Sequence, residues 1–131
     1  MSVIIPFNRR DFVLRPSVSL LPLPARAAAE PSLAVAAREM GVEFAHVHWA
    51  GDITLVASLA AGEGLAVTLR ARPDVPEQVE RMVLLGGAQA AEGVREAALS
   101  LRVPRSQLVA AIARHTDGRM TGALAELRIS A

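Results

Sequence analysis

The stretch "AALSLRVPRSQLVAAIARH", residues 97–115, decides how the second half of the chain is interpreted. Its apolar residues recur at spacings of three and four on both sides of Pro104, which is the period of an amphipathic helix. Proline is also favoured at the first position of a helix. We therefore expect one helix before Pro104, a tight turn, and a second helix that ends near "TDG" (116–118).

Residues 94–113 resemble the helix-turn-helix pattern of phage repressors, which place the second helix in the major groove of DNA. Ala98 stands where a small residue lets the two helices approach, and apolar residues surround the turn. The resemblance implies nucleic-acid contacts by three residues at the start of the second helix, Arg105, Ser106 and Gln107.

Two departures weaken this resemblance. Arg102 occupies the turn position that usually holds glycine and often has a positive φ. Val109, Ala110 and Ala113 would face the DNA, and their side chains offer almost no hydrogen bonds for reading bases. A packed helix pair is therefore preferred over a DNA reader.

Upstream, the hydrophobic period changes from that of a helix to that of a strand. "LAVTLRAR" (65–72) and "ITLVASLA" (53–60) alternate, and "AGEG" (61–64) is a good hairpin loop. Together with "VEFAHVHW" (42–49), these segments predict a three-stranded antiparallel meander. A short helix is the alternative for residues 53–60, because short apolar runs are ambiguous.

The first third of the chain combines an extended segment with one helix. "EPSLAVAAREMG" (30–41) predicts a helix that starts at Pro31 and stops before Gly41. Prolines interrupt the preceding residues, which excludes a long helix there, yet these residues are too apolar for a solvated tail. We expect an extended arm that docks on a neighbouring chain, with contacts from Ile4, Ile5, Phe7, Phe12, Leu20 and Leu21.

These elements predict an arm over residues 1–30 and a single α+β domain over residues 31–131. In order, the chain would form an extended N-terminal arm, one helix, a three-stranded antiparallel meander and a helical C-terminal half. Residues 122–130 could be a last helix or a final strand.

The composition excludes several chemistries. The chain has no cysteine and no lysine, which excludes disulfides, thiolate metal sites, a Schiff-base lysine and a P-loop lysine. The net charge of +1 predicts no general attraction to nucleic acid or to anionic membranes. No nucleophile elbow, phosphate loop or carboxylate pair is present, so we expect a protein that is not an enzyme and needs no cofactor.

A histidine pair offers one candidate ligand site. "HVHWAGD" (46–52) resembles the first metal motif of cupins, with Asp52 where a glutamate is usual, but no second motif follows. We therefore predict no metal. On the polar face of the meander, His46, His48, Arg70 and Arg72 could instead hold an anion, beside Thr54, Ser58 and Thr68.

The uncharged runs are too short for a transmembrane helix. "NRRDFVL" (8–14) resembles a twin-arginine export signal, but Arg15 and three prolines break the apolar region that such a signal needs, so we expect a cytoplasmic protein. The leading hypothesis is a small non-catalytic protein-protein interaction or assembly subunit, as a homo-oligomer or in a larger assembly. The alternatives are a helix-turn-helix regulator and an anion- or metal-binding module that uses His46 and His48.

Overall fold

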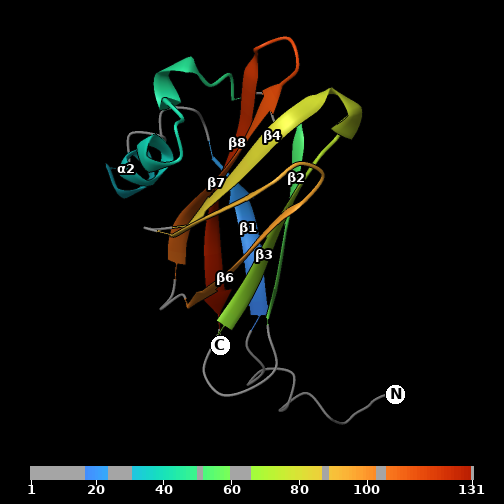
Figure 1. The fold of residues 1–131 in the computed structure, drawn as a ribbon. Helices are drawn as coiled ribbons and strands as arrows, with labels where there is room; N and C mark the ends of the chain where they lie inside the picture. The colour runs from blue at the N-terminus through green and yellow to red at the C-terminus, as the bar shows by residue number, and fades with distance from the viewer. Residues whose placement is uncertain are drawn as a thin grey trace, which may run out of the picture.

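In the part of the chain that the structure describes, two antiparallel β-sheets pack face to face, and helix α2 lies on the outer side of the larger sheet (Figure 1). The computed structural model describes residues 17–23, 31–49, 52–59, 66–86, 89–102 and 106–130. The strands are β1 (Ser17–Pro22), β2 (Ile53–Leu59), β3 (Ala66–Pro73), β4 (Val79–Gly86), β5 (Gln89–Gly93), β6 (Ala97–Arg102), β7 (Ser106–His115) and β8 (Met120–Ser130). The helix is α2 (Pro31–Glu39), and two 3-10 helices are η2 (Phe44–His46) and η3 (Pro76–Gln78).

The five-stranded sheet has the order β1-β8-β7-β4-β5, and the three-stranded sheet has the order β2-β3-β6. In the larger sheet, β7 and β8 form a hairpin in continuous register from Ser106↔Arg128 to Arg114↔Met120. The turn of this hairpin contains Gly118, whose φ of +92° favours glycine. The hairpin therefore places β7 and β8 in the middle of the sheet, with β1 and β4 added on its two sides.

Two separate apolar clusters hold the layers together. The first lies between the two sheets and contains Leu69, Leu84 and Leu127, which are fully buried. The second lies on the opposite face of the larger sheet, where Leu33 of α2 packs with residues such as Ile112 of β7. The larger sheet is therefore covered on both faces, by the smaller sheet on one and by α2 with the segment that follows it on the other.

The expectation of a helical C-terminal half is wrong, and so is the α+β class. Residues 79–86, 97–102 and 106–115 are strands, and the described part of the chain after residue 73 contains no α-helix. The error has a physical cause. In β4 and β7 the buried residues are consecutive, because both faces of these strands are covered. A strand of this kind loses its alternation, and its alanines then favour a helix by propensity alone.

In the earlier part of the chain, the observed elements agree more closely with those predicted from the sequence. The helix expected over residues 30–41 is present as α2, and the strands expected over 53–60 and 65–72 pair as β2 and β3. The third strand of the meander is wrong, since residues 42–49 contain η2 and the partner of β3 is β6. Residues 122–130 belong to strand β8, one of the two alternatives left open by the sequence.

Strand β1 lies within the expected arm, yet it belongs to the larger sheet of the same chain. It pairs with β8, so that Leu20 lies opposite Leu127 and Leu21 lies opposite Glu126. Leu20 packs against the cluster between the sheets, whereas Leu21 points the other way and is 39% exposed. Ile4, Ile5, Phe7 and Phe12 lie outside the described residues, and the division into an arm (1–30) and a domain (31–131) stays a prediction. Within the parts that the structure describes, no helix is long and apolar enough to cross a bilayer.

The two adjacent leucines of β1 allow a matched test of this placement. We expect Leu20→Ala to lower the free energy of unfolding by about 2 kcal/mol, because it removes apolar contacts from the cluster between the sheets. Leu21→Ala should cost less than ~1 kcal/mol, because that side chain is exposed. Urea unfolding followed by circular dichroism measures both. Equal losses would contradict the register of β1.

Candidate functional site

The outer face of the three-stranded sheet is an exposed polar surface. Side chains alternate along each strand, so Val67, Leu69 and Ala71 of β3 point inward and the residues between them point outward. The register between the strands brings the outward residues of β2, β3 and β6 into one surface. We call this surface the arginine face; it contains Thr54, Val56, Ser58, Thr68, Arg70, Arg72, Ala98, Ser100 and Arg102.

The charges on the arginine face do not cancel. Glu96, which directly precedes β6, accepts hydrogen bonds from Arg72 Nε at 3.0 Å and from Arg70 Nη1 at 3.3 Å. The hydrogen bond from Arg72 is the main reason that the pKa of Glu96 lies below its ordinary value. Within the described ranges, no carboxylate pairs with Arg102. Glu96 thus pairs with two of the three arginines, and Asp74 at the edge of the face accepts a hydrogen bond from Thr54 Oγ1 at 3.0 Å. Three guanidinium groups therefore stand against two carboxylates, and the surface keeps a positive excess.

Part of the ligand face expected from the sequence coincides with this surface. Arg70 and Arg72 lie on it together with the polar residues of β2 and β3. His46 and His48 do not, because they belong to the segment around η2 that packs on the opposite face of the larger sheet. Both histidines are exposed, and the described residues contain no group of three His, Cys, Asp or Glu side chains that could hold a metal ion.

The residues expected to contact nucleic acid do not belong to a recognition helix. Ser106 and Gln107 begin β7 and pair with Arg128 and Leu127 of β8. Arg105 lies outside the described residues. The helix-turn-helix interpretation is therefore wrong, and the nucleic-acid partner that it implied loses its structural basis.

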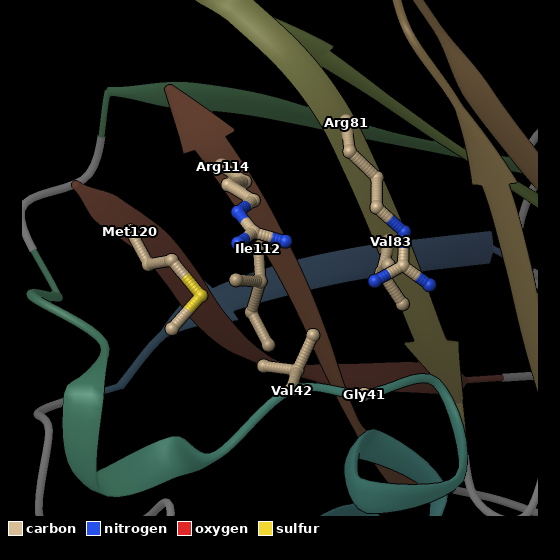
Figure 2. Close-up of a pocket in the computed structure, with 7 residues that line it drawn as sticks. All are labelled: Gly41, Val42, Arg81, Val83, Ile112, Arg114 and Met120. Atoms are coloured by element: carbon tan, nitrogen blue, oxygen red, sulfur yellow. The ribbon is translucent and has the colours of Figure 1, made fainter. Parts of the chain in front are cut away.

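A recess lies on the other face of the larger sheet, beside the turn that follows α2. Figure 2 shows its seven lining residues, which are Gly41, Val42, Arg81, Val83, Ile112, Arg114 and Met120. The cavity volume is about 10 Å³, roughly the room that one water molecule needs. Two arginines therefore stand beside a floor of buried apolar side chains.

Each arginine of the recess has a carboxylate neighbour. Arg81 donates from Nε to Glu92 Oε2 at 2.6 Å and from Nη2 to Glu92 Oε1 at 3.3 Å. The hydrogen bond from Arg81 lowers the pKa of Glu92 below its ordinary value. Arg114 Nε lies 3.3 Å from Glu80 Oε1. Glu92 thus fixes the orientation of Arg81, while Arg114 has a single carboxylate contact and a side chain that is 54% exposed.

A buried polar cluster lies at one end of the apolar layer between the two sheets. His115 Nε2 lies 2.8 Å from Thr121 Oγ1 and 3.8 Å from Asp52 Oδ2. A relay for nucleophilic catalysis needs the hydroxyl and the carboxylate on different ring nitrogens. Here both approach Nε2, and Nδ1 has no hydrogen-bond partner among the described residues. The cluster is therefore structural.

Sequence reasoning missed both the recess and the buried cluster. Thr121 follows His115 by six residues across the turn of the β7–β8 hairpin, and this proximity could be recognised only if residues 106–130 were assigned to strands. Arg81 and Arg114 are far apart in the sequence and meet only through the pairing of β4 with β7. Neither site has a local motif that could have revealed it.

Comparisons with known proteins find a solved structure of similar fold. The chain is similar to the solved structure of the sulfur carrier protein SoxY from Chlorobium limicola f thiosulfatophilum, with a TM-score of 0.52 and 16% sequence identity. The similarity covers 78% of this chain and 95% of that one. At this identity the comparison shows a common fold. No protein-family model and no curated protein sequence matches the chain.

Thr121→Val tests the buried cluster. The substitution preserves the shape of the side chain but removes the hydroxyl bonded to His115 Nε2. We expect it to lower the free energy of unfolding by about 1–3 kcal/mol, because the ring nitrogen stays buried without this partner. Thr121→Ser keeps the hydroxyl and should cost less. Chemical denaturation compares the two variants, and a larger loss in the serine variant would contradict a hydrogen-bonding role.

Glu96→Gln tests the electrostatics of the arginine face. The folded-state pKa of Glu96 is lowered, so its stabilising contribution is present above its ordinary value of 4.5 and is lost as the pH falls through the lower folded value. We expect wild type to be more stable than Glu96→Gln at neutral pH, and the difference to shrink below about pH 4.5. Thermal unfolding from pH 7 to pH 3 measures this. The control is Glu77→Gln, which changes an exposed carboxylate on η3; an identical pH profile for the two variants would contradict the role of Glu96.

Proposed function

We propose that this chain is a small non-catalytic protein-binding subunit that recognises an acidic protein surface through the arginine face. The observation that supports this most directly is the charge of that face. Arg70, Arg72 and Arg102 project from one exposed sheet, and within the described ranges the carboxylates bonded to that face are Glu96, which pairs with two of the arginines, and Asp74, which accepts from Thr54. Complementary charge speeds encounter and selects among partners.

The other side chains of the face suit a protein partner better than a small ligand. Val56, which is 53% exposed, lies directly opposite Arg70 in the β2–β3 ladder and gives the centre of the face an apolar spot. The surrounding threonines and serines have short side chains. Arginine is enriched in protein interfaces, and its planar fork binds carboxylates in pairs of hydrogen bonds.

The area of the arginine face is smaller than a stable protein interface needs. The contact is therefore weak, or other parts of the chain extend it. Strands lie about 4.8 Å apart and rise about 3.4 Å per residue, so three strands of seven residues present roughly 300 Å². A stable interface needs about 800 Å² from each partner. The predicted arm over residues 1–30 belongs to the proposal as a second contact. The proposal includes the case in which the partner is a second copy of this chain.

The similarity to SoxY supports a carrier-like or interaction role but not sulfur carriage by these residues. That protein is a sulfur carrier, which agrees with the expectation that the present chain is not an enzyme. Sulfur held covalently as a persulfide or disulfide requires a thiol, and none of the 131 residues is a cysteine. We therefore assign recognition, and not sulfur transfer, to this sandwich. A cytoplasmic location and a ligand at His46 and His48 stay predictions.

The test compares the native mass of the wild-type chain with that of a variant in which two arginines of the arginine face are replaced. We expect wild type in an extract of its host to elute above the 13.8 kDa of the monomer. The double variant Arg72→Gln/Arg102→Gln should shift toward monomer, and 0.5 M salt should weaken the wild-type association, since exposed charges are screened. Size-exclusion chromatography with light scattering measures both.

The matched control is Arg128→Gln, which removes an exposed arginine of β8 on the opposite side of the molecule. It should leave the native mass unchanged, and circular dichroism should show all variants folded. Wild type that is monomeric in the extract and at micromolar concentration would overturn the proposal. So would an association that the double variant and the control reduce equally.

A further inference from the structure

We infer that the free edge of β2 pairs with β2 of a second copy of this chain, so that the two three-stranded sheets join into one continuous sheet. This contact runs along the side of the sheet and needs no acidic partner, so it goes beyond the contact proposed for the arginine face. Three features of β2 support it: its composition, the incomplete burial behind it, and its complementarity to itself.

The first feature is the composition of the edge strand. Within the described ranges, β2 stands at the end of the order β2-β3-β6 and has a hydrogen-bonded neighbour only on the side of β3 (Figure 1). An exposed edge offers N–H and C=O groups to another strand, and proteins usually block it with charged residues, proline or a bulge. The sequence ITLVASL contains no charged residue and no proline, and its register with β3 is continuous.

The other strands at the ends of the two sheets differ from β2 in this respect. Strand β1 ends at Pro22, β5 contains Glu92 and Gly93, and β6 ends at Arg102. Among the end strands that the structure describes, β2 is therefore the one best suited to accept a further strand.

The second feature is incomplete burial behind this edge. The inward residues of β3 are fully buried between the two sheets: Val67, Leu69 and Ala71. Three inward residues of β2 pack against the same cluster but are only partly buried: Leu55, Ala57 and Leu59. On the outer face, Val56 is 53% exposed. A strand paired at this edge would cover apolar surface on both faces of β2, which is favourable.

The third feature is that β2 is complementary to itself. Antiparallel pairing about a two-fold axis at Val56, the middle residue, aligns all seven residues of the strand with those of the second copy. Thr54 then lies opposite Ser58, Leu55 lies opposite Ala57, and Val56 lies opposite its own copy. Outward residues meet outward residues and inward apolar residues meet each other, as the pleat of a sheet requires. A second copy therefore fits the edge along its whole length.

The arginines do not oppose this pairing. Arg70 lies opposite Val56 in the β2–β3 ladder, so the two copies of Arg70 would be three strand spacings apart, roughly 14 Å. This separation exceeds the screening length of about 8 Å at physiological ionic strength. The joined sheet would carry both arginine faces on one side and present about 600 Å². The pairing thus enlarges the surface proposed for an acidic partner without depending on that partner.

Sedimentation equilibrium of the purified full chain, without extract, over about 10–500 μM protein tests the pairing. We expect the mass to rise from the 13.8 kDa of the monomer toward twice that value, with a dissociation constant on the order of 10 μM, because one strand pair is smaller than a stable interface. Val56→Lys should weaken self-association at least roughly tenfold, since lysine on an edge strand blocks pairing.

Val35→Lys is the matched control, because Val35 of α2 is 52% exposed and Val56 is 53% exposed. It should keep the wild-type dissociation constant, and circular dichroism should show both variants folded.

A single introduced cysteine tests the register, since the natural chain has none. Residues opposite each other in an antiparallel pair have Cα atoms about 4.5–5.5 Å apart, a separation that a disulfide can bridge. Val56→Cys should therefore form a disulfide-linked dimer in a glutathione redox buffer, whereas Val35→Cys should stay monomeric on a non-reducing gel.

Three results would overturn the inference: a purified chain that is monomeric over the whole concentration range, equal losses in Val56→Lys and Val35→Lys, or equal cross-linking of the two cysteine variants. These results are distinct from the test of the arginine face. Arg72→Gln/Arg102→Gln should lose the complex in the host extract but keep the dimer of the purified chain.

Discussion

The burial of β4 and β7 on both faces is the constraint on which the rest of the structure depends. These two strands lie inside the larger sheet, with the smaller sheet on one side and α2 on the other. Alanines such as Ala110 and Ala111 face opposite clusters from adjacent positions in β7. Their small size lets both covering layers approach the sheet closely. The hydrophobic effect therefore holds three layers together through the large buried side chains of β4, such as Met82 and Leu84, and the mostly small ones of β7.

This layering also determines which surfaces remain free to act. The inner face of the smaller sheet and both faces of the larger sheet are largely used for packing, which leaves the outer face of β2, β3 and β6 exposed. The arginine face occupies that surface. On the other face of the larger sheet, α2 and the segment after it form the cover, and the recess lies beside Gly41 and Val42, next to Arg81 and Arg114.

The similarity to SoxY is a similarity of scaffold. A sandwich of two antiparallel sheets can present many different surfaces, because its core and its exposed side chains are chosen nearly independently. Gly122 shows how closely side chains pack in the core. A Cβ at Gly122 would lie 2.8 Å from the ring of Trp49, so the aromatic ring packs directly on the backbone of β8. The exposed arginines carry no such constraint and can differ between proteins of the same fold.

The sequence by itself determined the elements whose pattern is local. The capping and spacing of α2, the alternation of β2 and β3, and the grouping of Arg70 with Arg72 on one polar face follow from residues near one another in the chain. Only the tertiary structure decided that residues 97–115 are strands, because their consecutive apolar residues reflect burial by two different layers. The same holds for Arg81 with Arg114 and for His115 with Asp52, which meet through pairing and packing between distant segments. An amphipathic helix and a strand buried on both faces can have the same local pattern of apolar residues. The layers that pack around the segment are what distinguish the strand from the helix.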